Sequence, residues 1–323
     1  MMNRRFALAF SLALGWAGAA QAQNQGTYPN KPVKFVVAFA PGGPADIIAR
    51  LLGQRLSENI GQPVVIENKA GAGGSLASGL VAKAPADGYT LMINTSSYAV
   101  NASMAKSTSF DAEKDFVLAS VVASSPNLLV AYPSLKSKNL QEIMAEAKSG
   151  KLNYGSAGAG TTPHLTAEYL FKVLGKVNVT HIPFQGAGPA LAATMGGQVE
   201  MASVALPAAV EMVKGGKVRG LAVTSNKRVA SMPDVPTVAE SGFPGFEDYT
   251  WVGVFVPSKT SPEIVTYLNL EVGKILRSAD FQSKLAGVGF EPVGGTPKEA
   301  GDYLKVEIAK WAKIIKETGV KVD

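Results

Sequence analysis

The sequence predicts an α/β protein of two lobes, each built on a mostly parallel sheet covered by helices. A strand, a glycine-containing turn and a helix recur in that order along the chain, which is the pattern of parallel α/β structure. Two long apolar segments without a helical period interrupt this pattern, as expected where a chain passes between lobes. The length of 323 residues is also large for one domain, and a 46% hydrophobic composition is sufficient for an extensive core.

The N-terminal segment has the pattern of a secretory signal peptide. Arg4 and Arg5 precede an apolar run that ends near Ala17, and small residues follow up to Ala22. A run of roughly 12 apolar residues is shorter than the ~20 that a membrane-spanning helix needs. We therefore expect residues 1–22 to be a cleaved export signal. Cleavage leaves 301 of the 323 residues and lowers the formal net charge from +6 to +4, because two arginines leave and no acid does.

The composition excludes several classes of function. The chain has no cysteine, which excludes disulfides, iron–sulfur clusters, thiolate metal sites and cysteine nucleophiles, and its two histidines are too few for a His-rich metal centre. We expect no cofactor and no metal. The remaining positive charge is small and scattered, which disfavours nucleic-acid binding. An exported chain without cysteine or anchor is typical of the bacterial periplasm, where we expect it to act as a monomer.

The first lobe is predicted to contain strand, turn and helix units followed by a third strand. Pro41 to Pro44 break the first unit, and Ser75 is the expected N-cap of the second helix, after the glycine turn at 71–74. The strands are apolar runs and the first helix shows a four-residue apolar repeat. These elements are strands at 33–39, 63–67 and 90–94 and helices at 45–59 and 76–84.

The chain is predicted to cross to the second lobe between Asp115 and Tyr132 and to return through residues 249–257. Both segments are apolar and β-rich. The second lobe has a similar alternation, with helices at 140–147, from Pro163 and after Pro189, and strands at 152–154, 177–182, 199–204 and 218–224. Helices from Ser261 and an amphipathic C-terminal helix with Leu304, Ile308, Trp311 and Ile315 on one face complete the first lobe. The predicted division is 23–123 plus 248–323 for the first lobe and 124–247 for the second.

The glycine loops do not match known nucleotide-binding motifs. Leu76 stands where a G-x-G-x-x-G fingerprint beginning at Gly71 needs its third glycine, and no Gly-Lys pair is followed by the Ser or Thr of a Walker A loop. The hydrolase pattern G-x-S-x-G is nearly matched around Ser75, but Ala77 replaces its last glycine. A capping role for Ser75 is favoured, and an exported esterase with Ser75 as nucleophile remains an alternative.

Two loops are predicted to bind an anion. In Pro41 to Ala45 the glycines allow close approach, and the backbone N–H groups and the positive end of the next helix dipole face one point. The second loop, Ser156 to His164, leads into a helix with Thr162 as expected N-cap and Pro163 at its first position. Two such helix N-termini on facing lobes can hold two carboxylates without an arginine. The alternative is that the glycines only form tight turns.

Single residues near these loops have simpler expected roles. His164 lies in the first turn of its helix, where it can hydrogen-bond a ligand or cap a carbonyl, whereas His181 is expected to be a core or edge residue. Asp46 is expected to stabilise the helix dipole and fix the first loop. Tyr249 and Trp251 are expected in the core, with a place in a cleft as the alternative.

Phrases spread in order over the whole mature chain resemble the tripartite tricarboxylate transporter substrate-binding proteins, also called the Bug family. As a set they are specific, although each alone is weak. They are Tyr28-Pro29, Pro41-Gly42-Gly43, Asp46-x-x-Ala49-Arg50, Glu67-Asn68-x-x-Gly71-Ala72-Gly73-Gly74, Ala86-Asp87-Gly88-Tyr89-Thr90-Leu91, Asp111-x-x-x-Asp115-Phe116, Tyr154-Gly155-Ser156-Ala157-Gly158-x-Gly160, Ile182-Pro183-Phe184-x-Gly186 and Leu221-Ala222-Val223-Thr224.

The resemblance implies a type II periplasmic binding-protein fold, in which two α/β lobes joined by crossover strands close on a small carboxylate. It implies that the loop after the first strand and the loop opening the second lobe's long helix grip the ligand through backbone amides and waters. The segment after the third strand and the turn after Ile182-Pro183 would complete the cleft. The candidate ligand-binding residues are Phe39, Ala40, Pro41, Gly42, Gly43, Pro44, Ala45, Asp46, Thr95, Ser96, Ser97, Ser156, Ala157, Gly158, Ala159, Gly160, Thr161, Thr162, His164, Phe184, Gln185, Gly186 and Val204.

Two departures from the family pattern bear on the ligand. The turn that commonly reads Tyr-Lys-Gly is Phe184-Gln185-Gly186 here, and Val204 stands where members often carry an Asp. The loss of that acid argues against an amino-acid ligand and implies a more apolar cleft. We therefore expect a non-enzymatic receptor that captures a dicarboxylate or aromatic carboxylate by domain closure and delivers it to membrane transporter subunits. A ligand sensor that feeds a two-component sensor kinase is the alternative with a different partner.

Overall fold

The structure, a computed structural model, describes residues 28–104, 109–150 and 152–321. The predicted signal peptide, residues 1–22, lies outside the described residues. Within the described ranges, no helix combines the length and apolar character needed to cross a membrane.

The first part of the sheet combines strands from both ends of the chain in the order β2-β1-β3-β9-β4, with β10 paired to β4. The first three strands are parallel and the remaining pairs are antiparallel. The strands are β1 Val33–Val37, β2 Val64–Asn68, β3 Thr90–Thr95, β4 Phe116–Ala131, β9 Tyr249–Pro257 and β10 Glu291–Gly294. The helices are α2 Pro44–Ile60, the short turn η1 Ala72–Gly74, α3 Ser75–Val81, α4 Ser97–Met104, α9 Pro262–Leu276, α10 Ala279–Gly287 and α11 Pro297–Thr318.

The second part of the sheet is formed around the C-terminal half of β4. There β4 pairs with β7 and β8, and β5 lies between β7 and β6. The strands are β5 Asn153–Ser156, β6 Thr180–Pro183, β7 Met201–Ala205 and β8 Arg219–Val223. The helical segments are α5 Leu140–Ala147, α6 Thr162–Glu168 with its π-helical continuation η2 Tyr169–Leu174, α7 Ala187–Met195, η3 Leu206–Ala208 and α8 Val210–Lys214.

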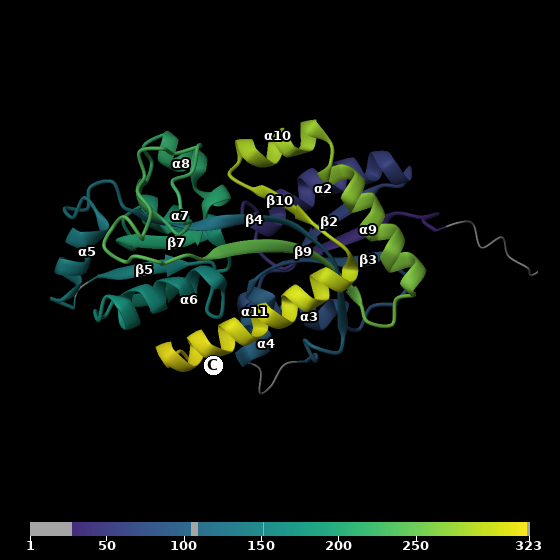
Figure 1. Cartoon of the computed structure of the whole chain (residues 1–323), viewed down its shortest axis with the longest axis horizontal. Coiled ribbons are helices and arrows are strands. Elements are labelled where there is room, and N and C mark those ends of the chain that lie inside the picture. The colour runs from purple at the N-terminus through teal and green to yellow at the C-terminus, as the bar shows by residue number, and fades with distance from the viewer. Residues whose placement is uncertain (1–27, 105–108, 151, 322–323) are drawn as a thin grey trace, which may run out of the picture.

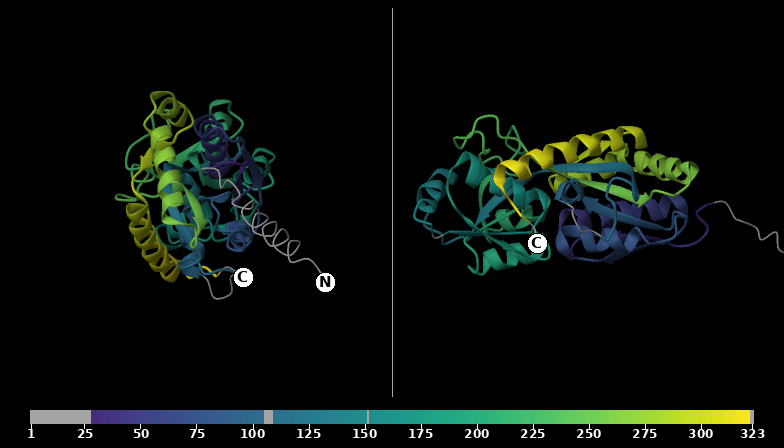
Figure 2. Two further views of the ribbon diagram at one scale, coloured as in Figure 1. Left: turned by 90° about the vertical axis from the view of Figure 1, so that its right-hand side faces the viewer. Right: turned by 90° about the horizontal axis from the view of Figure 1, so that it is seen from below.

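The hydrophobic core is divided in the same way. One cluster contains side chains from residues 33–123 and 251–311, together with Leu165, and two others contain only side chains from residues 128–246. We call the parts around these clusters lobe 1 and lobe 2. Figure 2 shows them as two bodies, with α11 lying along the first and reaching the second.

Two adjacent strands connect the lobes, as the two apolar segments predict. The 16-residue strand β4 pairs with β9 from Phe116 to Pro126 and then with β7 from Asn127 to Ala131. Figure 1 shows β4 and β9 passing side by side through the centre of the molecule. The predicted outward and return crossings are therefore confirmed as strands.

The C-terminal helix α11 also bridges the lobes. It begins with a capping box between Thr296 and Glu299 and ends at Gly319 in the left-handed conformation. Its amphipathic face includes Trp311, which is fully buried. The helix packs on β4 and α4 and also touches α6 and η2 of lobe 2, so it spans the junction between the lobes.

Several local predictions are wrong. The N-cap of α3 is Gly74 and not Ser75, which is the first helical residue, and the N-cap of α6 is Thr161 and not Thr162. Gly74 has a φ of 101°, in the left-handed region, which glycine adopts more easily than serine does. The side chain of Thr162 is instead hydrogen-bonded to Ser96 of lobe 1. Helix α3 ends at Val81, three residues before the predicted end.

Candidate functional site

A small pocket lies between the lobes, at the carboxyl ends of the strands. Helices α2 and α4 of lobe 1 and α6 and α7 of lobe 2 all begin next to it. The cavity volume is about 20 Å³, a little more than one ordered water requires. The described residues that line it carry no charge; they are Phe39, Gly43, Pro44, Thr95, Ser97, Ala157, Thr161, Pro163, Ala187, Ala205 and Thr250.

The loops of the two lobes touch around this pocket. Ser96 Oγ and Thr162 Oγ1 are 2.5 Å apart, and the Thr162 N–H donates to Ser97 Oγ at 3.2 Å. A further bond joins the Ala40 N–H to the carbonyl oxygen of Gln185 at 3.4 Å. The three contacts connect the strand ends of lobe 1 with the helix starts of lobe 2, so the lobes are held together directly at the rim of the pocket.

The first loop is fixed by the carboxylate of Asp46, as the sequence predicts. Asp46 accepts the Gly42 N–H at 3.0 Å, two bonds from Arg50 at 2.9 and 3.0 Å, and one from the Asn68 amide at 3.0 Å. Burial alone would raise the pKa of Asp46, but the bonds from Arg50, Gly42 and Asn68 outweigh it and lower that pKa. The second amide proton of Asn68 is donated to the carbonyl of Phe39. The backbone from Phe39 to Gly42 is thereby tied to the first turn of α2.

The second loop is stabilised by its own side chains. Ser156 Oγ accepts the Gly158 N–H at 3.2 Å, and Thr161 Oγ1 donates to the Gly158 carbonyl at 2.7 Å. The Gly160 N–H donates to Nδ1 of His164 at 3.2 Å. Gly158 and Gly160 have φ angles of 138° and 73°, which favour glycine at both positions. This loop therefore enters the pocket in a defined shape.

Three helix N-termini, the positive ends of helix dipoles, adjoin this pocket. The first N–H groups of a helix have no partner within the helix. Helices α2, α6 and α7 begin at or next to the lining residues Pro44, Pro163 and Ala187, so their first N–H groups lie beside the pocket. Thr95 and Ser97 line the same space, and Thr95 Oγ1 donates to Ser97 Oγ at 3.0 Å. Backbone dipoles and hydroxyl groups around an uncharged pocket suit an anion such as a carboxylate.

Comparison with known proteins agrees with this geometry. Residues 48–320 match the family model described as "Tripartite tricarboxylate transporter family receptor". The chain belongs to this receptor family. Its members are binding proteins and not enzymes, which removes the esterase alternative. The protein BugT of Bordetella pertussis is 35% identical over 326 residues, covering 100% of both chains.

Solved structures of the family share the fold of this receptor. A protein of R. palustris solved with adipate has a TM-score of 0.88 and 38% identity, covering 91% of this chain and 99% of its own. MatC from Rhodopseudomonas palustris, solved with bound malate, has a TM-score of 0.84 and 33% identity over 89% of this chain and 100% of its own. The mixed α/β periplasmic binding-protein fold implied by the sequence is confirmed, and both of these relatives were solved with carboxylates.

The structure brings most of the predicted binding residues of this receptor to one place. Seven of them line the pocket, namely Phe39, Gly43, Pro44, Thr95, Ser97, Ala157 and Thr161. The others in the two loops and the turn at 184–186 are neighbours of these residues, and Gly186 packs on Ala40. Val204 does not line the pocket, because it points into a hydrophobic cluster of lobe 2, and Ala205 lines it instead. Trp251 is a core residue, as expected.

Four lining residues are absent from the sequence prediction: Pro163, Ala187, Ala205 and Thr250. Pro163 and Ala187 each adjoin a predicted residue. Thr250 lies on β9 between Tyr249 and Trp251. A threonine flanked by two aromatic residues in a crossover strand is the signal that points to it. The side chain donates to Asn127 of β4 at 2.7 Å, so the two crossing strands are linked beside the pocket.

His164, which is buried, and His181, which is half-buried, form a pair behind the second loop. Their rings stack with centroids 3.8 Å apart, and His181 Nε2 lies 2.7 Å from Ser156 Oγ. Burial, with a smaller effect of Lys172, lowers the pKa of His164 to about 4, and burial lowers that of His181 to about 3. His164 accepts the Gly160 N–H, so the expected carbonyl cap is not seen in this bond. His164 does not line the pocket, and its contact with a ligand stays a prediction.

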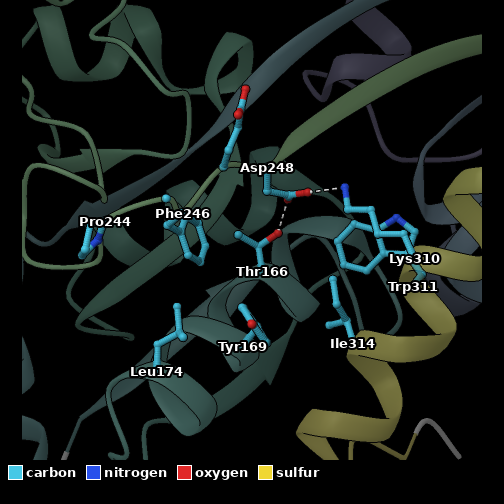
Figure 3. Close-up of a pocket in the computed structure, with 11 residues that line it drawn as sticks. Thr166, Tyr169, Leu174, Pro244, Phe246, Asp248, Lys310, Trp311 and Ile314 are labelled. Atoms are coloured by element: carbon cyan, nitrogen blue, oxygen red, sulfur yellow. Dashed lines mark hydrogen bonds and ion pairs between the residues drawn. The ribbon is translucent and has the colours of Figure 1, made fainter.

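A second, larger pocket of about 210 Å³ lies where α11 meets lobe 2. Figure 3 shows Asp248 between Thr166 of α6 and Lys310 of α11. Asp248 accepts bonds from Thr166 at 2.5 Å, from Asn127 at 2.8 Å and from Lys310 at 3.0 Å. Burial raises the pKa of Asp248, while Asp248 and Glu307 raise that of Lys310 against the effect of burial. This network joins both lobes and the strand β9.

Proposed function

We propose that this receptor binds a small dicarboxylate or aromatic carboxylate in the pocket between the lobes and delivers it to a tripartite tricarboxylate-type membrane transporter. The convergence of four helix starts on an uncharged pocket carries the proposal, because the positive ends of helix dipoles from both lobes favour an anion there. The adipate and malate bound to the two R. palustris proteins support a carboxylate ligand. No acid among the described lining residues is placed to pair with an ammonium group, so an amino acid is disfavoured.

Ligand entry requires the lobes to move apart. The pocket holds about 20 Å³, so a dicarboxylate enters only when the contacts of Ser96 and Ala40 with lobe 2 are broken. We place the hinge at β4 and β9 and divide the lobes at 23–123 plus 248–323 and 124–247. A ligand that contacts both lobes shifts the population toward the closed form, which the membrane partner recognises.

A thermal-shift screen with carboxylates tests the ligand class. Adipate, malate and benzoate form the carboxylate arm, 1,6-diaminohexane is the cationic control and hexane-1,6-diol is the uncharged control. We expect a rise in melting temperature with at least one carboxylate and none with the controls. The absence of a shift with every carboxylate, or an equal shift with the diol, contradicts the proposal.

A pair of serine variants on α4 tests the position of the site. Ser97 lines the pocket, and Ser97→Ala removes the hydroxyl that accepts the Thr162 N–H and the Thr95 hydroxyl. We expect the affinity for the carboxylate identified by the screen to fall about tenfold, the cost of one hydrogen bond. Ser103→Ala on the same helix removes a hydroxyl that donates to Ala99 and Ile308 away from the pocket, and leaves the affinity unchanged.

The cellular location and the partner have separate tests. We propose export to the periplasm with cleavage near Ala22, which N-terminal sequencing of the protein from a periplasmic extract checks. Cross-linking of the carboxylate-loaded receptor to purified transporter membrane subunits, with a purified two-component sensor kinase as the parallel arm, distinguishes a transport partner from a sensor.

A further inference from the structure

Two stacked histidines, one buried and one half-buried, lie behind the second loop of lobe 2. His164 lies in the first turn of α6 and is 4% exposed, and His181 lies on the neighbouring strand β6. Each ring is hydrogen-bonded to the second loop: His164 to Gly160 and His181 to Ser156. These two points lie near the two ends of the loop whose residues Ala157 and Thr161 line the pocket.

The bond from Gly160 fixes the protonation state of His164. Nδ1 accepts the backbone N–H, so this nitrogen carries a lone pair and the neutral ring has its proton on Nε2. A proton on Nδ1 would place two N–H donors opposite each other at 3.2 Å. The Gly160 N–H would then lose its partner in a buried position, which costs more than an ordinary hydrogen bond.

The charged and titratable groups around the pair favour neutral rings. Tyr154 of β5 lies 5.0 Å from His181 and donates to Glu168 of α6. Glu168 also forms an ion pair with Lys172 of η2, so its charge is largely compensated. Lys172 disfavours protonation of both histidines, while Glu168 favours protonation of His181. Burial dominates, and the pKa values of both rings lie well below 6.5.

We propose that His164 is a positioning residue for ligand binding: its neutral Nδ1, supported by the stacked ring of His181, holds the loop from Ser156 to Thr162 in the shape that grips the carboxylate. The inference rests on the proposed function, since it concerns the same pocket. It makes carboxylate affinity dependent on an acceptor at the position of Nδ1. Acid that protonates His164 releases the loop and weakens binding.

Three substitutions of His164 separate this role from simple packing. His164→Asn places Oδ1 where Nδ1 stands, so it retains the acceptor and cannot be protonated near neutral pH. His164→Gln places its amide near the Nε2 position, and His164→Ala has no acceptor. Calorimetric titration at pH 7.5 with adipate and malate is expected to show His164→Asn within about threefold of the wild type and the other two about tenfold weaker. Equal affinities of Asn and Gln variants overturn the proposal.

The pH profile supplies a second readout. Between pH 7.5 and pH 4 the wild type is expected to lose affinity faster than His164→Asn. Protonation of the probe carboxylate affects both proteins equally, so the ratio of their dissociation constants isolates the histidine. A ratio that stays constant over this range overturns the proposal. Because the chain has only two histidines, their ring proton resonances in untagged protein assign the titration directly.

Hydrogen exchange tests the loop without any ligand. We expect the amides of the peptide covering residues 156–165 to exchange faster in His164→Gln and His164→Ala than in the wild type and His164→Asn. If no carboxylate binds the wild type, the proposed function fails, while this measurement still decides whether His164 holds the loop. Identical exchange in all four proteins overturns the positioning role.

Discussion

Single residues control both the acid stability of the receptor and the approach of its lobes. The pKa values of His164 and His181 are lowered to about 4 and about 3, whereas a histidine in the unfolded chain titrates near 6.5. At a pH between the folded and unfolded pKa values, each histidine is protonated in the unfolded chain and neutral in the folded protein. The free energy of unfolding therefore rises with pH, by up to about 1.4 kcal/mol per pH unit for each histidine. Urea unfolding between pH 4.5 and 7.5 should show this slope. In His164→Asn the slope should fall by about half, and an unchanged slope contradicts the assignment.

A glycine in lobe 1 sets how closely the lobes approach. A Cβ atom at Gly73 would lie 2.5 Å from the carbonyl oxygen of Ala159 in the second loop. We expect Gly73→Ala to weaken carboxylate binding more than tenfold, because the closed form cannot be reached without a backbone shift. Gly61→Ala is the matched control, since Gly61 has a similar φ, 65° against 59°, and open space at its Cβ position. It should lose about 1 kcal/mol of stability and keep its affinity. Equal affinities of the two variants would exclude the steric role of Gly73.

At the scale of elements, the apolar runs of the sequence predict the strands of both lobes well. Helix α4 is not predicted from the sequence. Its first five residues are all buried, so the segment shows no amphipathic period. Strand β10 is missed because it has four residues, includes Pro292 and pairs only along β4. The two loops are found from glycine and proline, but Ala205 and Thr250 reach the pocket through strands that only the tertiary fold brings together. Residue type gives no indication of this position for Ala205, and Thr250 is marked only by its two aromatic neighbours.

The start of α11 is a local element that can be tested by itself. Thr296 accepts the Glu299 N–H, and Glu299 accepts the Thr296 N–H at 2.7 Å. Thr296→Ala should lower the free energy of unfolding by about 1 kcal/mol, the usual cost of an N-cap. Thr318→Ala at the other end of α11 removes a hydroxyl bonded only to backbone carbonyls of its own helix and to the Val320 N–H, and should cost less. Chemical denaturation compares the two, and an equal loss would show that the cap is not used.

At the scale of the whole molecule, the Asp248 network connects the two lobes at their junction. Asp248 directly precedes β9 and is bonded to Thr166 of α6 and to Lys310 of α11. One carboxylate therefore joins three elements at the junction of the lobes. A buried charge that loses its partner is strongly destabilising, whereas an amide in the same place is tolerated better. Lys310 has a side chain that is 36% exposed, so solvent screening reduces the effect.

The variants Lys310→Met, Asp248→Asn and their combination test this link. We expect Lys310→Met to lower the free energy of unfolding by about 2 kcal/mol, less than a fully buried pair would lose. The double variant should recover part of that loss, because no uncompensated carboxylate remains. Small-angle scattering without ligand should show a larger radius of gyration for Lys310→Met than for the wild type, since α11 no longer holds lobe 2 through Asp248. If stability falls and the radius of gyration does not change, the network stabilises the fold without governing closure.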